Sequence, residues 1–169
     1  MLALVFGILG VIVNMLIYLQ KSGMKLLIFK LLSDLFWSLH YLCIAAYSAS
    51  LIAAVNIFRE LIFMYQYKKG IKNNGFLIIF LLIGIVTAAL TWNGLGSILP
   101  TLVAALSTFG FWRSDPKLSR RLAFPSSGCM ITYDIISGSV IGIVNEALAL
   151  TASVIGIIRE KKTDKEKTA

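Results

Sequence analysis

The chain has 169 residues, of which 58% are hydrophobic and 14% are charged, and its mean hydropathy is +0.85. A soluble domain carries about 25% charged residues, so this composition excludes an ordinary soluble protein and indicates an integral helical membrane protein. The net charge of +8 would suggest nucleic-acid binding in a soluble protein, but here the Lys and Arg residues lie in short segments between apolar runs. We expect them to act as topology signals and to contact anionic lipid headgroups.

Seven apolar segments follow one another along the chain, and each predicts a membrane-spanning helix. The predicted spans are residues 2–19, 25–47, 51–67, 76–92, 97–112, 122–137 and 140–158. A turn is expected at Ser48-Ala49-Ser50, and another at Asn93-Gly94 after the fourth span. Pro125 is expected to bend or interrupt the sixth span. Tyr18 is expected to belong to an aromatic belt at the membrane surface.

The basic residues alternate between successive loops. They follow spans 1, 3, 5 and 7 and are missing after spans 2, 4 and 6. By the positive-inside rule this pattern places the N-terminus outside and the C-terminus in the cytoplasm. An alternative with six spans would join residues 122–158 into one long kinked helix, but it would place the basic tail outside.

The first and last three spans also have the same order and orientation. A weak similarity between Lys25–Asn56 and Lys117–Asn145 aligns Tyr41 with Tyr133 and Asn56 with Asn145. The predicted fold is therefore an all-α membrane protein with two parallel three-helix repeats joined by a linker helix, a 3+1+3 plan known in transporters. The predicted parts are residues 1–68 (first repeat), 69–95 (linker with the fourth helix), 96–160 (second repeat) and 161–169 (polar cytoplasmic tail).

Several ionisable side chains fall near the middle of the spans, where each costs about 2.5–3.5 kcal/mol on insertion scales. Arg59 stays protonated, so at this depth it needs a carboxylate partner. Asp34 is the nearest candidate in the sequence, and Asp134 or Glu146 could serve across the interface between the repeats. A structural ion pair is favoured over direct binding of an anion. With Glu60, the carboxylates outnumber Arg59, and the excess could carry protons or stay neutral.

Four motifs resemble the bacterial YgjV-type inner-membrane protein family. They are S-L-H-Y-L-C-I-A-A-Y-S-A (38–49), N-I-F-R-E-L-I-F (56–63), W-N-G-L-G-S-I-L-P (92–100) and I-T-Y-D-I-I-S-G-S (131–139). The resemblance implies a multi-pass protein of the bacterial inner membrane. More distantly, the 3+1+3 plan resembles the SWEET, SemiSWEET and PQ-loop transporters, in which an Asn on the third helix of each repeat and a Trp on the second line a central pocket. Asn56, Asn145 and Trp37 are the matching positions.

These observations predict a small-solute transporter with a polar pocket between the repeats and with proton coupling as an option. The alternative is a non-transporting receptor, scaffold or assembly factor on the same bundle. The candidate substrate-binding residues are Asn56, Asn145, Trp37, Arg59, Tyr41 and Tyr133. The candidate proton-coupling or ion-pair residues are Asp34, Glu60, Asp134, Glu146 and His40, the last with helix packing as the favoured role.

The sequence shows no nucleophile–base arrangement and no phosphate-binding loop, so we do not expect an enzyme. One His and two Cys cannot assemble a recognised metal site, and no cofactor is expected. The expected partners are membrane lipids and a small polar solute; a homo-oligomer is left open, and nucleic acid is not expected.

Overall fold

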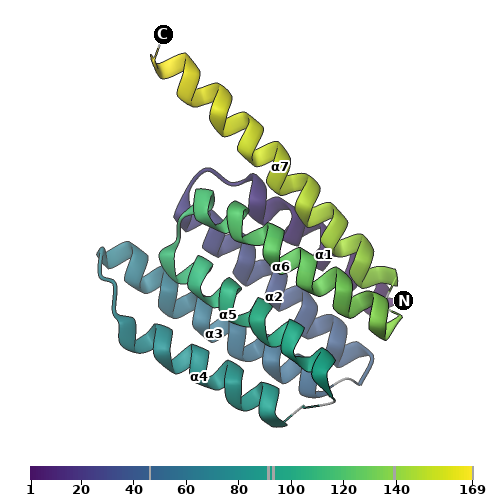
Figure 1. Cartoon of the computed structure of the whole chain (residues 1–169). Coiled ribbons are helices and arrows are strands. Elements are labelled where there is room, and N and C mark those ends of the chain that lie inside the picture. The colour runs from purple at the N-terminus through teal and green to yellow at the C-terminus, as the bar shows by residue number, and fades with distance from the viewer. Residues whose placement is uncertain (46, 91, 93, 139, 169) are drawn as a thin grey trace.

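The computed structural model describes residues 1–45, 47–90, 92, 94–138 and 140–168, and within them it contains seven α-helices, one short 3₁₀ helix and no strand. The helices are α1 (Leu2–Leu19), α2 (Gly23–Cys43), α3 (Tyr47–Lys69), α4 (Asn74–Leu90), α5 (Ile98–Arg113), α6 (Pro116–Ser137) and α7 (Val140–Thr168), and the 3₁₀ helix η1 is Leu95–Ser97. They pack side by side with connections alternating between the two ends of the bundle, and α7 extends beyond it (Figure 1). The seven-helix, all-α prediction is confirmed.

One end of the bundle carries the basic segments, and we call it the basic end. There α1, α3 and α5 finish and α2, α4 and α6 begin (Figure 1). The lysines and arginines near this end are Lys21, Lys25, Lys68, Lys69, Lys72, Arg113, Lys117, Arg120 and Arg121. The alternating charge of the sequence therefore corresponds to a sorting of charge to one end of the fold.

Two glycines mark the turns at the other end. Gly138 separates α6 from α7 with φ of +72°, a left-handed conformation that favours glycine, so the chain does not form a single long helix over 122–158. Gly94 has φ of +88°, as expected of a turn, whereas Asn93 lies outside the described residues.

The turn between α2 and α3 comes earlier than predicted. α2 ends at Cys43, Ala45 has φ of +58°, and the predicted turn residues 48–50 lie within α3. Ser50 instead joins the two helices, because its hydroxyl donates to the backbone oxygen of Ser38 at 3.1 Å. Small hydroxyl residues allow close helix approach in membranes, so this Ser-rich segment is a helix contact.

α6 begins earlier than predicted. The Asp115 side chain caps the helix by accepting from the backbone N–H of Lys117 at 2.9 Å, and Pro116 occupies the first turn, where its missing N–H costs nothing. Arg120, predicted in a loop, is therefore helical. Pro125 lies inside α6 without interrupting it.

The interior of the bundle is more polar than its surface. Among the described residues, fifteen buried side chains are polar or charged and nine are hydrophobic, whereas large apolar side chains cover the exterior. On α4, where no described residue is buried, the exposed side chains include Ile78, Leu82 and Val86. This distribution is the reverse of a soluble domain and fits a bundle with lipid around it.

By length and composition, α1, α2 and the Gly142–Lys162 part of α7 are long and apolar enough to cross a membrane. α4 and α5 are apolar but shorter, with 17 and 16 residues. α3 and α6 carry more charge, and their most deeply placed arginines, Arg59 and Arg120, are buried against neighbouring helices.

Six helices contact one another in the order α3, α2, α1, α7, α6, α5, and a smaller contact between α5 and α3 closes this ring. α4 packs against α5. Thus α2 lies between α1 and α3, and α6 lies between α5 and α7. An apolar cluster of Ile17, Leu26, Leu27, Phe63 and Phe111 fills the half of the bundle toward the basic end. The polar groups described next lie beside this cluster.

Candidate functional site

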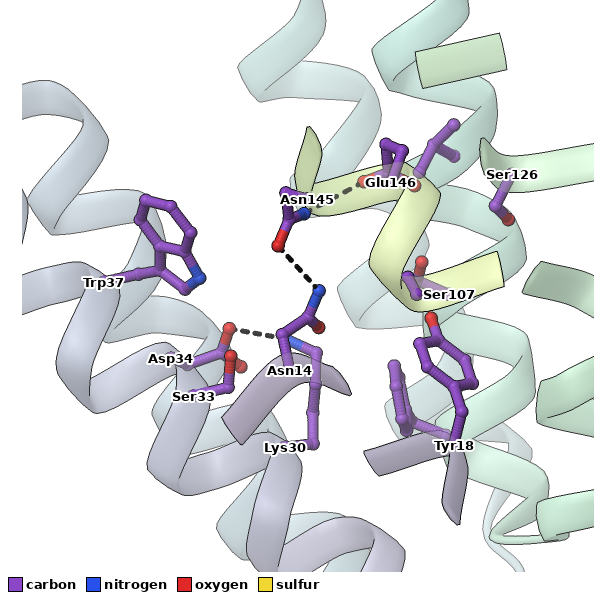
Figure 2. A pocket seen from close by; sticks show the side chains of 13 residues that line it. Asn14, Tyr18, Lys30, Ser33, Asp34, Trp37, Ser107, Ser126, Asn145 and Glu146 are labelled. Carbon is purple, nitrogen blue, oxygen red and sulfur yellow. Dashed lines mark hydrogen bonds and ion pairs between the residues drawn. The ribbon is translucent and has the colours of Figure 1, made fainter. Parts of the chain in front are cut away.

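A cavity of about 200 Å³ lies inside the bundle, and we call it the central cavity (Figure 2). Five helices line it, and none of the lining residues that the structure describes comes from α3 or α4. Its polar or amphipathic lining consists of Asn14 and Tyr18 from α1, Lys30, Ser33, Asp34 and Trp37 from α2, Ser107 from α5, Ser126 from α6, and Asn145 and Glu146 from α7. At about 30 Å³ per water, the volume corresponds to about seven water molecules.

An ion pair forms one wall of the cavity. Lys30 and Asp34 are one helical turn apart on α2, and the Lys30 ammonium binds Oδ1 of Asp34. The same ammonium lies 5.5 Å from the centre of the Phe111 ring on α5, within range of a cation–π contact. The other Asp34 oxygen, Oδ2, is buried, and no described protein group donates a hydrogen bond to it.

A chain of hydrogen bonds forms the opposite wall (Figure 2). Asn14 donates from Nδ2 to Oδ1 of Asn145 at 3.2 Å, and Asn145 donates from its own Nδ2 to Oε1 of Glu146, also at 3.2 Å. Ser127 on α6 donates to the second Glu146 oxygen, Oε2, at 2.6 Å. These contacts join α1, α6 and α7 and hold the Glu146 carboxyl group at the cavity.

Glu146 is half-buried and differs from Asp34 and Glu60, each of which has a cationic partner. Among the described residues, no Lys or Arg forms an ion pair with it, since Lys30 is engaged by Asp34. Asp134 adds a negative charge nearby. The Glu146 carboxyl therefore has hydrogen-bond donors but no cationic partner in the described part of the chain.

Four of the predicted site residues meet at the central cavity: Asn145, Trp37, Asp34 and Glu146. The indole nitrogen of Trp37 is on the side of its ring that faces Asn145 (Figure 2). The two pocket residues predicted on span 3, Asn56 and Arg59, are not part of the lining. The chemical roles of the four lining residues stay predictions.

Arg59 lies outside the cavity lining. Its Nε and Nη2 donate to Oε1 of Glu60 at 3.0 and 2.8 Å, and its Nη1 donates to Oγ1 of Thr108 on α5 at 3.0 Å. The predicted partners, Asp34, Asp134 and Glu146, are wrong, because the long Arg59 side chain reaches the next residue and Asp34 already binds Lys30. Arg59 does form an ion pair, but within α3, and its hydrogen bond to Thr108 links α3 to α5.

Asn56 does not line the cavity either, although it aligns with Asn145. The helix order explains the difference, because α2 lies between α1 and α3, while α7 packs directly against α1. The predicted approach of Asn56 to Asn145 is replaced by the contact between Asn14 and Asn145.

The remaining predicted residues lie outside the lining. Tyr41 stacks on Trp37 with ring centres 5.7 Å apart, and His40 meets Trp37 edge-on at 5.5 Å. His40 is also 2.7 Å through Nδ1 from the backbone oxygen of Ala3, so it joins α2 to α1. Asp134 is buried beside Gly142 of α7, where no larger residue would fit. Tyr133 is half-buried on α6.

Six of the ten polar or amphipathic cavity residues were not predicted, and Lys30, Asn14 and Tyr18 are the most informative of them. The sequence did contain a signal for Lys30, because a Lys four residues before an Asp predicts an ion pair on one helix face. Asn14 is the most polar residue of the first span but has no local partner in the sequence. Tyr18 was assigned to an aromatic belt, yet it lines the cavity near the basic end.

A second polar cluster lies between the cavity and the basic end, and we call Arg120, Lys117 and Glu160 the Arg120 cluster. Arg120 donates to the backbone oxygens of Tyr18, at 2.8 Å, and of Gln20. It thereby supplies donors to carbonyl groups at the C-terminal end of α1. It also donates to Oε2 of Glu160 on α7 at 2.7 Å, and Lys117 lies 3.0 Å from Oε1.

The close approach of the three helices at this cluster requires a glycine. A Cβ atom at Gly156 of α7 would lie 2.6 Å from the backbone oxygen of Tyr18 and 2.5 Å from Nε of Arg120. α1, α6 and α7 are therefore fastened together directly beside Tyr18, the cavity residue nearest this end.

An apolar exterior around a buried polar cavity defines a multi-pass α-helical membrane protein. The chain belongs to the Imp-YgjV family, described as a bacterial inner membrane protein, and the family model matches residues 1–164. The resemblance stated from the four motifs is thus confirmed, and the protein is one of the bacterial inner membrane. No curated protein and no solved structure matches the chain.

Proposed function

We propose that this protein moves a small polar solute across the bacterial inner membrane through the central cavity, without chemical conversion of the solute. The observation that carries the proposal is the cavity itself, with ten polar or amphipathic side chains from five helices around about 200 Å³. Such groups are costly inside a membrane and are characteristic of solute and ion pathways. Glu146, which has no cationic partner among the described residues, could couple this movement to protons.

The order of helix contacts supports two parallel repeats. In a 3+1+3 plan, α1, α2 and α3 correspond to α5, α6 and α7. The contact of α1 with α7 then corresponds to the contact of α5 with α3, and both are present. A twofold pseudo-axis along the membrane normal requires this pattern, and the cavity would lie near that axis, where transporter repeats place their solute.

A receptor, scaffold or assembly factor is the second candidate. It is favoured by the Arg59–Glu60 and Lys30–Asp34 pairs, because an ion-paired interior can serve stability alone. A scaffold has no need of a carboxyl group at a cavity, so Glu146 favours transport.

The proposed topology places the basic end in the cytoplasm, since loops with Lys and Arg are retained there. We expect a membrane-impermeant thiol reagent, applied to intact spheroplasts, to label cysteines introduced at Trp92 and Val140 but not at Ile71. All three positions are exposed, and the background would lack Cys43 and Cys129. Labelling at Ile71 from outside, with Val140 protected, would reverse the assigned orientation.

The transport proposal predicts that Asn145 is required and that Asn56 is not. In proteoliposomes, Asn145→Ala is expected to reduce uptake at least about tenfold, the loss of a hydrogen bond worth about 1.5 kcal/mol or more to a polar solute. Asn56→Ala is the matched control and should stay within about twofold, because Asn56 lies outside the cavity.

The solute panel for this experiment would contain small amines, polyols, amino acids and organic acids, each tested in both directions with and without a pH gradient. Folded protein that moves none of them would exclude the transport proposal and leave the scaffold. Equal loss in both asparagine variants would place the pathway elsewhere in the bundle.

A further inference from the structure

The charges that line the central cavity do not balance. Lys30 contributes one positive charge, and Asp34 and Glu146 contribute one negative charge each when ionised, so the lining carries a net charge of −1. Arg59 cannot compensate, because it lies outside the lining and binds Glu60. A buried charge without a partner is costly, so the cavity favours one additional positive charge, on a solute or as a proton on a carboxyl group.

The cavity also presents a hydrogen-bond acceptor that lacks a donor among the described residues, so it favours a ligand that donates hydrogen bonds. Oδ2 of Asp34 is a buried acceptor without a described donor, on a side chain that is 8% exposed and lines the cavity. Glu146 presents a second carboxyl group from α7. A ligand that satisfies these groups must donate hydrogen bonds, and an ammonium group with three N–H donors does so.

The third feature is an aromatic side chain at the same cavity. Trp37 lines the cavity, and the face of an indole ring is the best aromatic partner for a cation. Lys30 already faces an aromatic ring, that of Phe111, so a positive charge beside an aromatic group recurs here.

We propose that the transported solute is a small organic monocation with an ammonium group, bound between Glu146 and Asp34 beside Trp37, and that it exchanges with a proton carried by Glu146. This inference rests on the proposed function and names its substrate class. When the ammonium binds, the Glu146 carboxyl releases one proton to solvent, and when the solute leaves, Glu146 takes a proton back. The cavity then holds one added positive charge in either state.

The ionisable groups around Glu146 come from three other helices. They are Tyr18 on α1, Lys30 and Asp34 on α2, and Asp134 on α6; the α5 residues of the lining, Val103, Ser107 and Phe111, carry none. Since Lys30 pairs with Asp34, Glu146 is the group at which a proton and an ammonium compete.

Three probes of one size and different charge test the substrate class: ethanolamine, ethylene glycol and glycolate. With wild-type protein in detergent, calorimetry should detect ethanolamine binding at least about tenfold tighter than binding of the other two, for a charged pair worth about 1.4 kcal/mol or more. The affinity should fall as pH falls, approaching tenfold per pH unit when one proton is displaced per cation, as linkage requires. Tighter binding of glycolate or ethylene glycol would overturn the proposal.

A pair of variants tests the role of Glu146. Glu146→Gln keeps groups for the Ser127 and Asn145 contacts but removes the charge, and it should lose both ethanolamine binding and its pH dependence. The matched control is Asp134→Asn, which removes a nearby buried carboxylate and should retain binding within about threefold, because Asp134 lies outside the lining. Equal losses in the two variants would overturn the assignment to Glu146. If Glu146→Gln does not fold, the comparison of the three probes on the wild-type protein still tests the substrate class.

Proteoliposomes separate this inference from the proposed function. Ethanolamine uptake driven by an opposing proton gradient supports both. Uptake of only neutral or anionic solutes overturns the cation class and leaves transport in place. Ethanolamine binding without movement of any solute in the panel retains the site and overturns transport.

Discussion

Replacing Arg59 with methionine is expected to lower the free energy of unfolding by about 3–5 kcal/mol, the cost of breaking a buried ion pair from one side. Glu60 is 0% exposed and would be left without the guanidinium, either as an unpaired buried charge or as a carboxyl group that must take up a proton, and both are costly. The hydrogen bond from Arg59 to Thr108, which joins α3 to α5, would also be lost. Unfolding by denaturing detergent in mixed micelles measures this loss.

The double variant Arg59→Met/Glu60→Leu should recover most of the lost stability, because hydrophobic side chains often replace a buried pair without net cost. The control combines Arg59→Met with Asp34→Asn and should give nearly additive losses, since Asp34 binds Lys30. Additive losses for Arg59 and Glu60 themselves would show that the two side chains are not partners.

Arg120→Ala is expected to cost at least about 3 kcal/mol, the sum of two charge-assisted hydrogen bonds at about 1.5 kcal/mol each. Arg120 is 3% exposed, and its guanidinium binds the end of α1 and Glu160 of α7 together. Arg120→Lys should restore less than half of the loss, because an ammonium lacks the planar fork that reaches several acceptors.

The neighbouring arginine provides the control for this measurement. Arg121 is exposed, and Arg121→Ala should change the unfolding free energy by less than about 0.5 kcal/mol, as for most surface substitutions. Similar losses for the two alanine variants would mean that Arg120 acts through its charge alone and does not fasten α1 to α7.

The helices could be predicted from the sequence because membranes impose simple rules on length and charge. The alternation of charge between loops predicted that α6 and α7 are separate helices, and the structure has Gly138 between them. The errors lie at helix ends, where specific contacts decide: Ser50 bonds to Ser38 across α2 and α3, and Asp115 caps α6 before its basic residues.

The candidate site could be predicted only in part. Periodicity shows which residues share a helix face, and Asp34 and Trp37, three residues apart on α2, both line the cavity. Periodicity does not show which helices are neighbours. Because α7 packs against α1 and α3 does not, Asn145 meets Asn14 and not Asn56.

The continuity of α7 links the Arg120 cluster to the cavity. Glu146 and Glu160 are 14 residues apart on this one helix, which corresponds to about four turns and about 21 Å of rise, so the two carboxyl groups lie on nearly the same face. The contacts of Glu160 with Arg120 and Lys117 thereby fix the rotational setting of the face that carries Glu146. Loss of these contacts would remove this constraint on the rotation of α7 and on the orientation of Glu146 toward the cavity.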